Sequence, residues 1–328
     1  MKEIRIGENE SGQRLDKFLL KYMSRAPKSF IYKMLRKKNI TLNGKKAQGN
    51  EQLRQGDAVK LFLSDDTIGK FSEHRPAGYV GEAELDILYE DKHTIFINKP
   101  AGMLSQKAKA EDVSLVEHLT AYLLKTGQIS EEALATFRPS VCNRLDRNTS
   151  GIVAAGKSLA ALQQLSAMFR ERSLRKYYLC LVHGKVAEAR RISGFLSKDE
   201  RTNRVKVQRG REEKAPGKEE SRIETEYRPL RTGDGVTLLE VHLITGKTHQ
   251  IRAHLASEGH PIIGDYKYGV RSVNDRFKKE YGLSSQLLHS CRLCFPDCGG
   301  ALSELSGKEI TAPVPDLFRR ICREKGVM

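Results

Sequence analysis

The chain has 328 residues, of which 39% are hydrophobic and 30% are charged, and its formal net charge is +16. This length favours two domains, and no apolar run approaches the roughly 20 residues that span a bilayer. The polar N-terminus lacks a signal-peptide core, so we expect a cytoplasmic protein with no membrane partner. The excess of positive charge favours a polyanionic partner such as RNA.

Positive charge is concentrated near the N-terminus. Residues 1–63 hold 15 lysines and arginines against 6 acidic residues, so a fifth of the chain carries more than half of the net charge. A charge run is often only a solvated surface. Its restriction to one small segment favours a dedicated nucleic-acid-binding module.

The first predicted elements lie within residues 12–63. Apolar residues at helical spacing predict one helix over 15–22 and a second that starts near Pro27. The Asn-Gly pair at 43–44 predicts a tight turn between strands. Seven basic residues on the polar faces are the predicted RNA contacts: Arg14, Lys17, Lys28, Arg36, Lys37, Lys38 and Lys45.

Three short motifs occur along this N-terminal unit: Arg14-Leu-Asp-Lys-Phe18, Ile40-Thr-Leu-Asn-Gly44 and Leu53-x-x-Gly-Asp57. Together with the second basic helix, they resemble the S4 RNA-binding domain. The resemblance implies that residues 12–63 bind RNA. S4 domains occur in ribosomal proteins, synthetases and modification enzymes, so this domain alone does not identify an activity.

The remainder of the chain is predicted to be a linker and one larger domain. Residues 64–83 are rich in Gly, Asp, Ser and Pro without a sustained period, which predicts the linker. Residues 84–328 form the second domain, which opens with two strand-like runs. The capping box Ser114-Leu-Val-Glu117 predicts the start of one helix, and a second helix is predicted over 159–170.

Strand signals dominate the C-terminal half. Residues 177–182 are continuously apolar, and residues 239–243 alternate between apolar and polar side chains. The charged segment 197–221 between them is predicted to be an exposed, mobile excursion. Because strands and helices do not alternate regularly, the predicted class is α+β, with a mixed, mainly antiparallel sheet in the larger domain.

The densest group of unusual residues is Asn143-Arg-Leu-Asp-Arg-Asn-Thr-Ser-Gly151. Asp146 lies between two arginines, and flanking cations favour the ionised form of a carboxyl group. A carboxylate that is positioned and dry is a competent covalent nucleophile. The local sequence is equally compatible with a turn or capping residue in a surface Arg–Asp network.

The wider set of motifs favours the catalytic interpretation. Five further segments occur in order around that group: Ile97-Asn-Lys-Pro-Ala-Gly102, Lys176-Tyr-Tyr-Leu-Cys-Leu-Val-His-Gly184, Thr245-Gly-Lys-Thr-His-Gln-Ile-Arg-Ala-His-Leu255, Gly259-His-Pro-Ile-Ile-Gly-Asp265 and Leu288-His-Ser290. With the Arg-Leu-Asp group, they closely resemble the RluA family of pseudouridine synthases over nearly all of residues 84–300.

The resemblance implies isomerisation of uridine to pseudouridine in RNA, in which the base is detached from ribose C1′, turned and rejoined through C5. The base must leave the helical stack, so the nucleotide is flipped out or lies in a single strand. A preceding S4 domain makes large-subunit (23S) ribosomal RNA the expected substrate. The alternatives are the same chemistry on transfer RNA, or a non-catalytic RNA-binding or ribosome-assembly factor on this fold.

Three catalytic residues are implied by the resemblance. Asp146 matches the family's catalytic aspartate, which can attack carbon or stabilise an electron-poor sugar. Tyr178 matches the tyrosine of the Lys-x-Tyr motif, which packs on the target base and assists proton transfer. Arg252 matches the arginine that pairs with the catalytic carboxylate. The alternatives are a half-buried strand aromatic for Tyr178 and a surface arginine for Arg252.

The expected substrate-binding residues are Arg144, Arg147 and Thr149. By resemblance, Arg144 occupies the vacated stack or holds the flipped nucleotide. Lys99 and Lys247 are weaker candidates that would contact phosphates or simply lie on the surface.

Two departures from the family pattern are visible. Asn143 stands where a histidine is common, and Asn98 stands where an aspartate is common. Neither belongs to the proposed catalytic trio, but they bear on which subgroup this chain belongs to and therefore on which uridine it selects.

The cysteines give little support for a metal site. Cys291, Cys294 and Cys298 are closely spaced, but on the strand predicted there Cys291 and Cys294 would face opposite sides, and a regularly spaced fourth ligand is missing. No glycine-rich phosphate loop or dinucleotide fingerprint appears. We therefore expect no metal, no organic cofactor and no required protein partner, and we expect a monomer.

Overall fold

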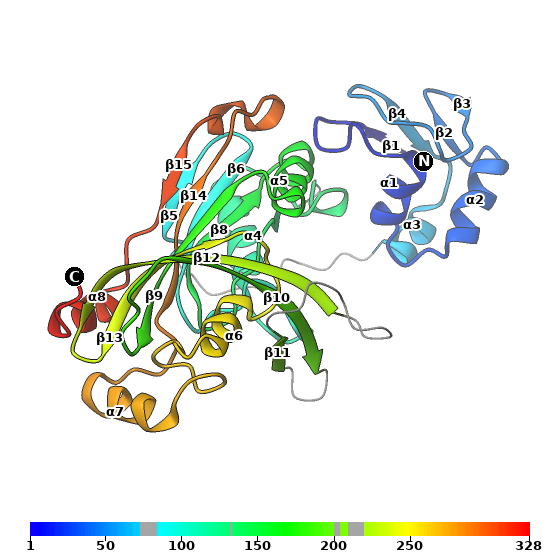
Figure 1. The fold of residues 1–328 in the computed structure, drawn as a ribbon. Helices are drawn as coiled ribbons and strands as arrows, with labels where there is room; N and C mark the ends of the chain where they lie inside the picture. Colours follow the sequence, from blue (N-terminus) through cyan, green and yellow to red (C-terminus); the bar gives the residue numbers. More distant parts are fainter. Residues whose placement is uncertain (73–83, 132, 200–203, 209–219) are drawn as a thin grey trace.

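The computed structural model describes residues 1–72, 84–131, 133–199, 204–208 and 220–328. Its strands form two separate sheets, a small one near the N-terminus and a large one in the rest of the chain (Figure 1). No helix in these described ranges combines the length and apolar character needed to cross a membrane.

The N-terminal unit is a four-stranded sheet, in the order β1-β4-β2-β3, packed against short helices. Leu15 and Phe18 on one helix and Ile31 on the next are completely buried in a single cluster, so the predicted amphipathic helices are present. The elements are β1 (Lys2–Arg5), α1 (Leu15–Tyr22), α2 (Lys28–Arg36), β2 (Ile40–Leu42), β3 (Lys45–Lys46), β4 (Ala58–Leu61) and α3 (Asp65–Phe71).

The segment predicted as the linker, 64–83, begins with the helix α3 rather than with irregular chain. The Ser64 hydroxyl caps the helix by accepting a hydrogen bond from the Thr67 N–H at 3.2 Å. Phe71 packs on Phe30 of α2, with ring centroids 4.5 Å apart. The helix therefore depends on tertiary contacts that its composition does not indicate. The remainder of the segment, 73–83, lies outside the described residues.

The large sheet has eleven strands and is almost entirely antiparallel. Nine strands follow the order β11-β10-β12-β13-β9-β14-β8-β6-β5, β15 pairs with β14, and β7 pairs with β8. The one parallel pairing among the described strands joins β8 to β14. The strands are β5 (Ile87–Glu90), β6 (Thr94–Lys99), β7 (Ser140–Val141), β8 (Ser150–Gly156), β9 (Arg175–His183), β10 (Arg190–Asp199), β11 (Arg204–Gln208), β12 (Glu220–Gly233), β13 (Val236–Leu243), β14 (Leu288–Cys294) and β15 (Glu309–Thr311).

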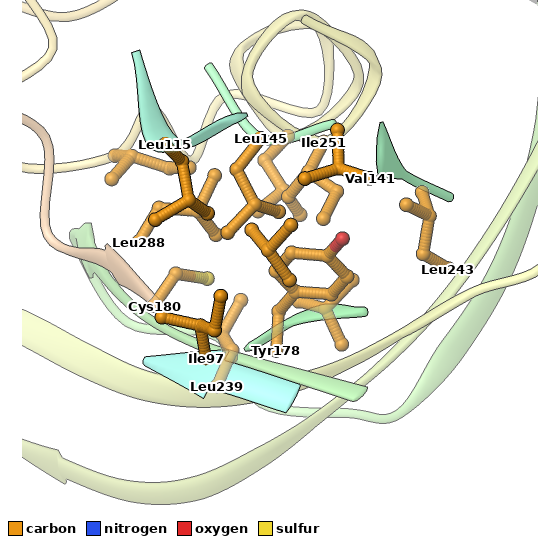
Figure 2. Packing of buried hydrophobic residues seen from close by; sticks show 14 of the residues in the cluster. Ile97, Leu115, Val141, Leu145, Tyr178, Cys180, Leu239, Leu243, Ile251 and Leu288 are labelled. Carbon is orange, nitrogen blue, oxygen red and sulfur yellow. The ribbon is translucent and has the colours of Figure 1, made fainter. Parts of the chain in front are cut away.

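Both faces of the sheet centre are covered. Along β6, Ile95 and Ile97 pack into one core cluster while Phe96 packs into another, as the two-residue period of a strand requires. The first cluster includes Tyr178 and is shown in Figure 2. The helical segments are α4 (Leu115–Lys125), the 3-10 turn η1 (Ala133–Ala135), α5 (Leu159–Glu171), α6 (Gln250–Ser257), α7 (Arg271–Tyr281), the 3-10 turn η2 (Gly300–Leu305) and α8 (Asp316–Glu324).

The segment 197–221 was predicted to be an exposed, mobile excursion, and this is wrong for part of it. Residues 204–208 form β11, which pairs with β10, and Val205 is buried in a small cluster with Ala253 of α6. The alternating Val205 and Val207 carry this strand pattern, but the surrounding charge obscures it. The other residues between β10 and β12, 200–203 and 209–219, lie outside the described residues.

Candidate active site

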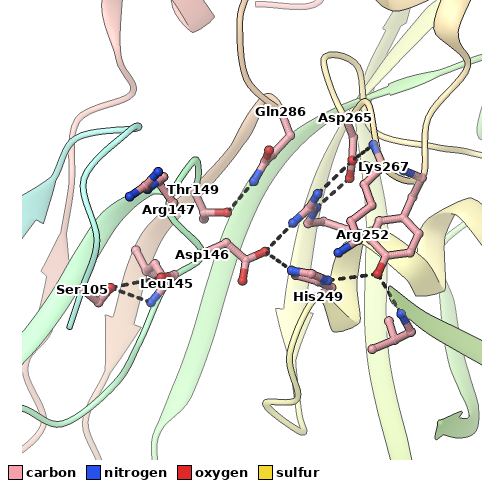
Figure 3. Close-up of polar contacts among 12 residues, drawn as sticks. Ser105, Leu145, Asp146, Arg147, Thr149, His249, Arg252, Asp265, Lys267 and Gln286 are labelled. Carbon is pink, nitrogen blue, oxygen red and sulfur yellow. Dashed lines mark hydrogen bonds and ion pairs between the residues drawn. The ribbon is translucent and has the colours of Figure 1, made fainter. Parts of the chain in front are cut away.

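Asp146 lies on the loop that connects β7 to β8, and its neighbours fix that loop. The Ser105 hydroxyl donates to the Leu145 carbonyl and accepts from the Leu145 N–H, both at 3.0 Å (Figure 3). The Asn143 amide donates to the Ile152 carbonyl and accepts from the Ala154 N–H. Asn143 therefore extends the strand pairing through its side chain, which gives this departure from the family pattern a structural role.

Lys99 also stabilises the loop that carries Asp146. It is completely buried, and its ammonium group donates to the carbonyls of Pro100, Met103 and Arg147 at 2.9, 2.9 and 3.1 Å. Burial lowers the pKa of Lys99 to about 8, although the charge of Asp146 opposes the shift. The suggestion that Lys99 contacts phosphate is wrong, because its three donors are already used inside the protein.

Arg252 joins Asp146 to a second, deeper carboxylate. Its Nη1 donates to Asp146 Oδ2 at 2.8 Å, while Nε and Nη2 donate to the two oxygens of Asp265 at 2.7 and 2.9 Å. The Asp265 side chain has no exposed area, and that of Asp146 is 24% exposed. Burial alone would raise the pKa of Asp265, but the hydrogen bonds and charge of Arg252 outweigh it and keep the pKa below its usual range.

This geometry fixes one oxygen of Asp146 and leaves the other accessible. Oδ2 accepts from Arg252, and the His249 Nε2 lies 3.9 Å from the same oxygen. None of the residues that the structure describes donates a hydrogen bond to Oδ1. The carboxylate is thus held in one orientation with a free oxygen that can reach a reacting carbon.

His249 is positioned by Tyr268, which lies three residues after Asp265 in the chain. Its Nδ1 lies 2.9 Å from the hydroxyl of Tyr268, and that hydroxyl accepts a hydrogen bond from the Val205 N–H of β11 at 3.0 Å. The Arg252 guanidinium lies over the Tyr268 ring, 5.3 Å from its centroid. Burial lowers the pKa of His249, so the ring is neutral at pH 7.

Asp146 opens onto a cavity of about 720 Å³. Tyr178 lines it and is 7% exposed, and burial raises the pKa of its phenol, so the hydroxyl stays protonated at neutral pH. Arg144 and Arg147 also line the cavity and are exposed. The structure thus brings the three predicted catalytic residues and the predicted substrate-binding residues around one cavity.

Thr149 differs from the two arginines because it is 2% exposed. Its N–H donates to the Asp146 carbonyl at 3.0 Å, and its hydroxyl accepts from the Gln286 amide at 3.1 Å. These bonds fix the end of the catalytic loop, so the contacts of Thr149 are internal.

Strands β8 and β14, next to the loop that carries Asp146, are packed too closely to accept larger side chains. Gly151 has a φ of +109°, and a Cβ at this position would overlap the backbone of Ser290 on β14. Next to it, His289 Nε2 donates to the Ala312 carbonyl at 3.3 Å and Nδ1 accepts from the Ser150 hydroxyl at 2.9 Å. Burial lowers the pKa of His289 to about 4, so this completely buried ring is neutral.

The seven predicted RNA-contact residues of the N-terminal unit are all exposed. Arg14 differs from the others, because its guanidinium forms an ion pair with Asp16 at 2.9 Å. The remaining six present their charge to solvent from α1, α2, the turn between α2 and β2, and the β2–β3 hairpin.

The sequence interpretation missed Asp265, His249 and Tyr268 as parts of the site. Asp265 and His249 belong to motifs that carried the family resemblance, so a signal was present but their roles were not assigned. Tyr268 had no such signal. The three closely spaced cysteines make separate contacts, and no group of three metal-ligating side chains occurs within the described parts of the chain.

Comparison with known proteins identifies the family of the chain. Residues 93–257, which contain Asp146, Tyr178 and Arg252, match the family model described as RNA pseudouridylate synthase. Ribosomal large subunit pseudouridine synthase C of Vibrio cholerae is 34% identical over 89% of this chain and 88% of its own length. The enzyme of the same name from Escherichia coli O157:H7 is 31% identical over 99% and 96%.

A solved structure shares the fold over about three quarters of the chain. Human RNA pseudouridylate synthase domain containing 4 aligns with a TM-score of 0.59 at 22% identity, over 73% of this chain and 92% of its own. The family model, the curated relatives and the shared fold agree with one another: the chain belongs to the RNA pseudouridylate synthase family.

Proposed function

We propose that this chain converts specific uridines of large-subunit ribosomal RNA into pseudouridine, with Asp146 as the catalyst. The observation that carries the proposal is the orientation of the Asp146 carboxylate, which Arg252 holds through Oδ2 at 2.8 Å at the edge of a cavity large enough for a nucleoside. The relatives named ribosomal large subunit pseudouridine synthase C support the choice of RNA.

The unbonded Oδ1 of Asp146 is the oxygen that would act on the sugar. It either bonds to ribose C1′ as the uracil leaves, or stabilises the positive charge that develops there. In either case the glycosidic bond breaks with its electrons on the base, the base turns, and C5 bonds to C1′. Any bond between Asp146 and C1′ breaks as C5 attacks. C5 then loses its proton and N1 gains one, so no oxidant or second substrate is consumed.

Arg252 and His249 have distinct supporting parts in this proposal. Arg252 binds Asp146 and, because Asp265 anchors its guanidinium, fixes the direction of the Asp146 carboxylate. When Tyr268 donates its proton to Nδ1 of His249, the neutral ring carries its own proton on Nε2, the nitrogen that faces Asp146. His249 is therefore a positioning residue whose Nε2 proton faces Asp146 Oδ2 from 3.9 Å.

Tyr178 is proposed to pack against the detached base and assist proton transfer. Burial keeps its hydroxyl protonated, so it acts first as a hydrogen-bond donor to the base. Arg144 and Arg147, exposed at the cavity, are proposed to bind the nucleotide and its neighbours, and Thr149 to fix the loop that carries Asp146.

The N-terminal unit is proposed to be an S4 domain that binds RNA. Its exposed surface cations support this, as does the alignment of the Escherichia coli relative over 99% of the chain, which includes this unit. We propose a division into an S4 domain within residues 1–72, a connecting segment, and a catalytic domain from residue 84. The proposed state is a monomer that works in the cytoplasm, where bacterial ribosomal RNA is found.

The test is pseudouridine mapping across total RNA from three strains that contain the intact chain, no chain, or Asp146→Ala. We expect one or more signals in large-subunit ribosomal RNA that vanish in both deficient strains. Loss confined to transfer RNA would overturn the substrate. Retention of every signal in the Asp146→Ala strain, with the protein present, would overturn the catalytic assignment.

A further inference from the structure

Lys176 is a buried cation that has no partner among the described residues. It lies near the start of β9, two residues before Tyr178, and both residues line the active-site cavity. Lys176 is 7% exposed, yet no described residue accepts a hydrogen bond from its amine or forms an ion pair with it. Burial, together with the nearby charge of Arg172, lowers the pKa of Lys176 to about 8. A buried charge without compensation is costly, so its retention calls for an anion that arrives from outside.

The amine points at a loop with free backbone donors. The loop Gly246–His249 leads into α6, and the backbone N–H groups of Gly246, Thr248 and His249 have no acceptor among the residues of the described ranges. A Cβ built at Gly246 would lie 3.7 Å from the Lys176 Nζ. The missing side chain therefore leaves space between the amine and the loop backbone.

The Lys176 amine and the free N–H groups before α6 are the kinds of group that bind phosphate in proteins. The start of an α-helix carries partial positive charge and unpaired N–H groups, which bind phosphate oxygens. A lysine supplies a compact charge with three donors. Arg144, Arg170 and Lys247 line the same cavity, and Asp146 is the single acidic residue among the described residues that line it.

We propose that Lys176 and the loop Gly246–His249 form a binding site for one RNA backbone phosphate, next to the nucleotide that reacts at Asp146. This inference rests on the proposed function, because it needs an RNA in the cavity. Side chains two residues apart on a strand are about 7 Å apart, so Lys176 and Tyr178 face neighbouring parts of the same cavity. A phosphate held at Lys176 would therefore fix the register of the flipped uridine against Tyr178.

The first experiment compares Lys176→Met, Lys176→Arg and the control Lys279→Met, which removes an exposed lysine of α7. The substrate is unmodified large-subunit ribosomal RNA from cells that lack the protein. We expect Lys176→Met to raise KM roughly tenfold with kcat within about twofold, and to reduce the slope of log affinity against log salt by about one. Lys279→Met should change neither quantity. Lys176→Arg should restore part of the affinity.

The second experiment neutralises phosphates one at a time. A stem–loop around the mapped uridine receives single methylphosphonate linkages, which keep the shape but remove the charge. We expect one linkage beside the uridine to weaken binding to the intact protein roughly tenfold, and to have no further effect on Lys176→Met. Equal losses for both proteins at every linkage would overturn the site, as would displacement by millimolar inorganic phosphate without any linkage effect.

Two further measurements distinguish loss of the phosphate site from a folding defect and from loss of catalysis. Removal of an unpaired buried charge should leave Lys176→Met at least as stable as the intact protein, so a large drop in Tm would assign Lys176 a structural role and overturn the inference. If Asp146→Ala retained turnover, the proposed function would fail. If Asp146→Ala were inactive but Lys176→Met kept its KM and salt slope, the phosphate site alone would fail.

Discussion

The chain uses charge in opposite ways in its two regions. In the N-terminal unit, all seven predicted RNA-contact cations are exposed, and six of them form no ion pair with any described residue. At the active site, Arg252 is 8% exposed and bridges two carboxylates, one of them completely buried. Exposed charges act together, each with a small effect, whereas charges in a buried network fix one geometry and are individually indispensable. Mutations should therefore have very different consequences in the two regions.

The largest expected effect is loss of the reacting carboxylate. Asp146→Asn keeps the shape of the side chain but removes the nucleophilic oxygen, so kcat should fall about a thousandfold or more. RNA affinity should change little, because the surface cations remain. Single-turnover assays and filter binding measure the two quantities, and turnover above a tenth of the normal rate would contradict the assignment.

Removal of Asp265, the buried partner of Arg252, should lower the stability of the fold as well as the catalytic rate. Asp265→Ala leaves Arg252 without its bidentate partner, and breaking such a buried pair costs about 3–5 kcal/mol of unfolding free energy. Asp275→Ala is the control. This exposed residue has only surface contacts, with Arg271 at 3.8 Å and with the Tyr266 hydroxyl at 3.0 Å, so its loss should cost under about 0.5 kcal/mol. Similar values for both variants in urea denaturation would contradict the difference between buried and exposed charge.

The buried His289 ring should make the free energy of unfolding depend on pH. Its pKa is about 4 in the folded protein and about 6.5 when unfolded, so the unfolded state binds the proton first. The contribution of His289 to the free energy of unfolding is therefore fully present above pH 6.5 and decreases as the pH falls toward 4. The total decrease is about 3 kcal/mol. His289→Gln should remove this part of the slope. Denaturation of both proteins at pH 7, 5.5 and 4 measures it, and parallel curves would exclude His289 as the cause.

Tyr268→Phe should have an intermediate effect. Without the hydroxyl, His249 loses the partner that fixes its tautomer, so kcat should fall roughly tenfold while KM stays nearly constant. If Tyr268 acts through His249, the double variant Tyr268→Phe/His249→Asn should be no slower than His249→Asn alone. Additive losses would instead indicate a general packing role for the ring.

The smallest effects are expected in the N-terminal unit. Lys37→Gln should weaken RNA binding roughly twofold to threefold, with kcat unchanged and stability within about 0.5 kcal/mol. The triple change of Arg36, Lys37 and Lys38 to Gln should flatten the salt dependence further, by about one unit of slope for each RNA phosphate that the protein no longer neutralises. An unaltered salt slope in the triple variant would place the RNA on another surface.

Much of the architecture follows from local sequence. Helical spacing of Leu15 and Phe18, the Ser114 capping box and the apolar run of β9 each predict an element that the structure contains. At the Ser114 capping box, the Ser114 N–H donates to the Glu117 carboxylate at 2.9 Å. Such signals depend on neighbours within a few residues, so they can be read directly from the chain.

The elements that the sequence obscured depend on distant partners. The helix α3 needs Phe30, which precedes it by more than 30 residues, and β11 needs the pairing with β10 and the surface of α6. Their own composition is polar, so local periodicity is weak. Tertiary contacts outweighed the local preference in both cases.

The sequence by itself predicted Asp146, Tyr178 and Arg252 as site residues, because the motifs around them resemble one enzyme family closely, but it did not indicate Asp265, His249 or Tyr268. Only the tertiary structure decided what each one touches. Asp146 and Arg252 are 106 residues apart, and their contact depends on the packing of α6 under the loop after β7. The fold also gave buried Lys99 three carbonyl acceptors and left the Lys176 amine with none among the described residues. This distinction between two lysines depends on solvent exclusion, which no local pattern encodes.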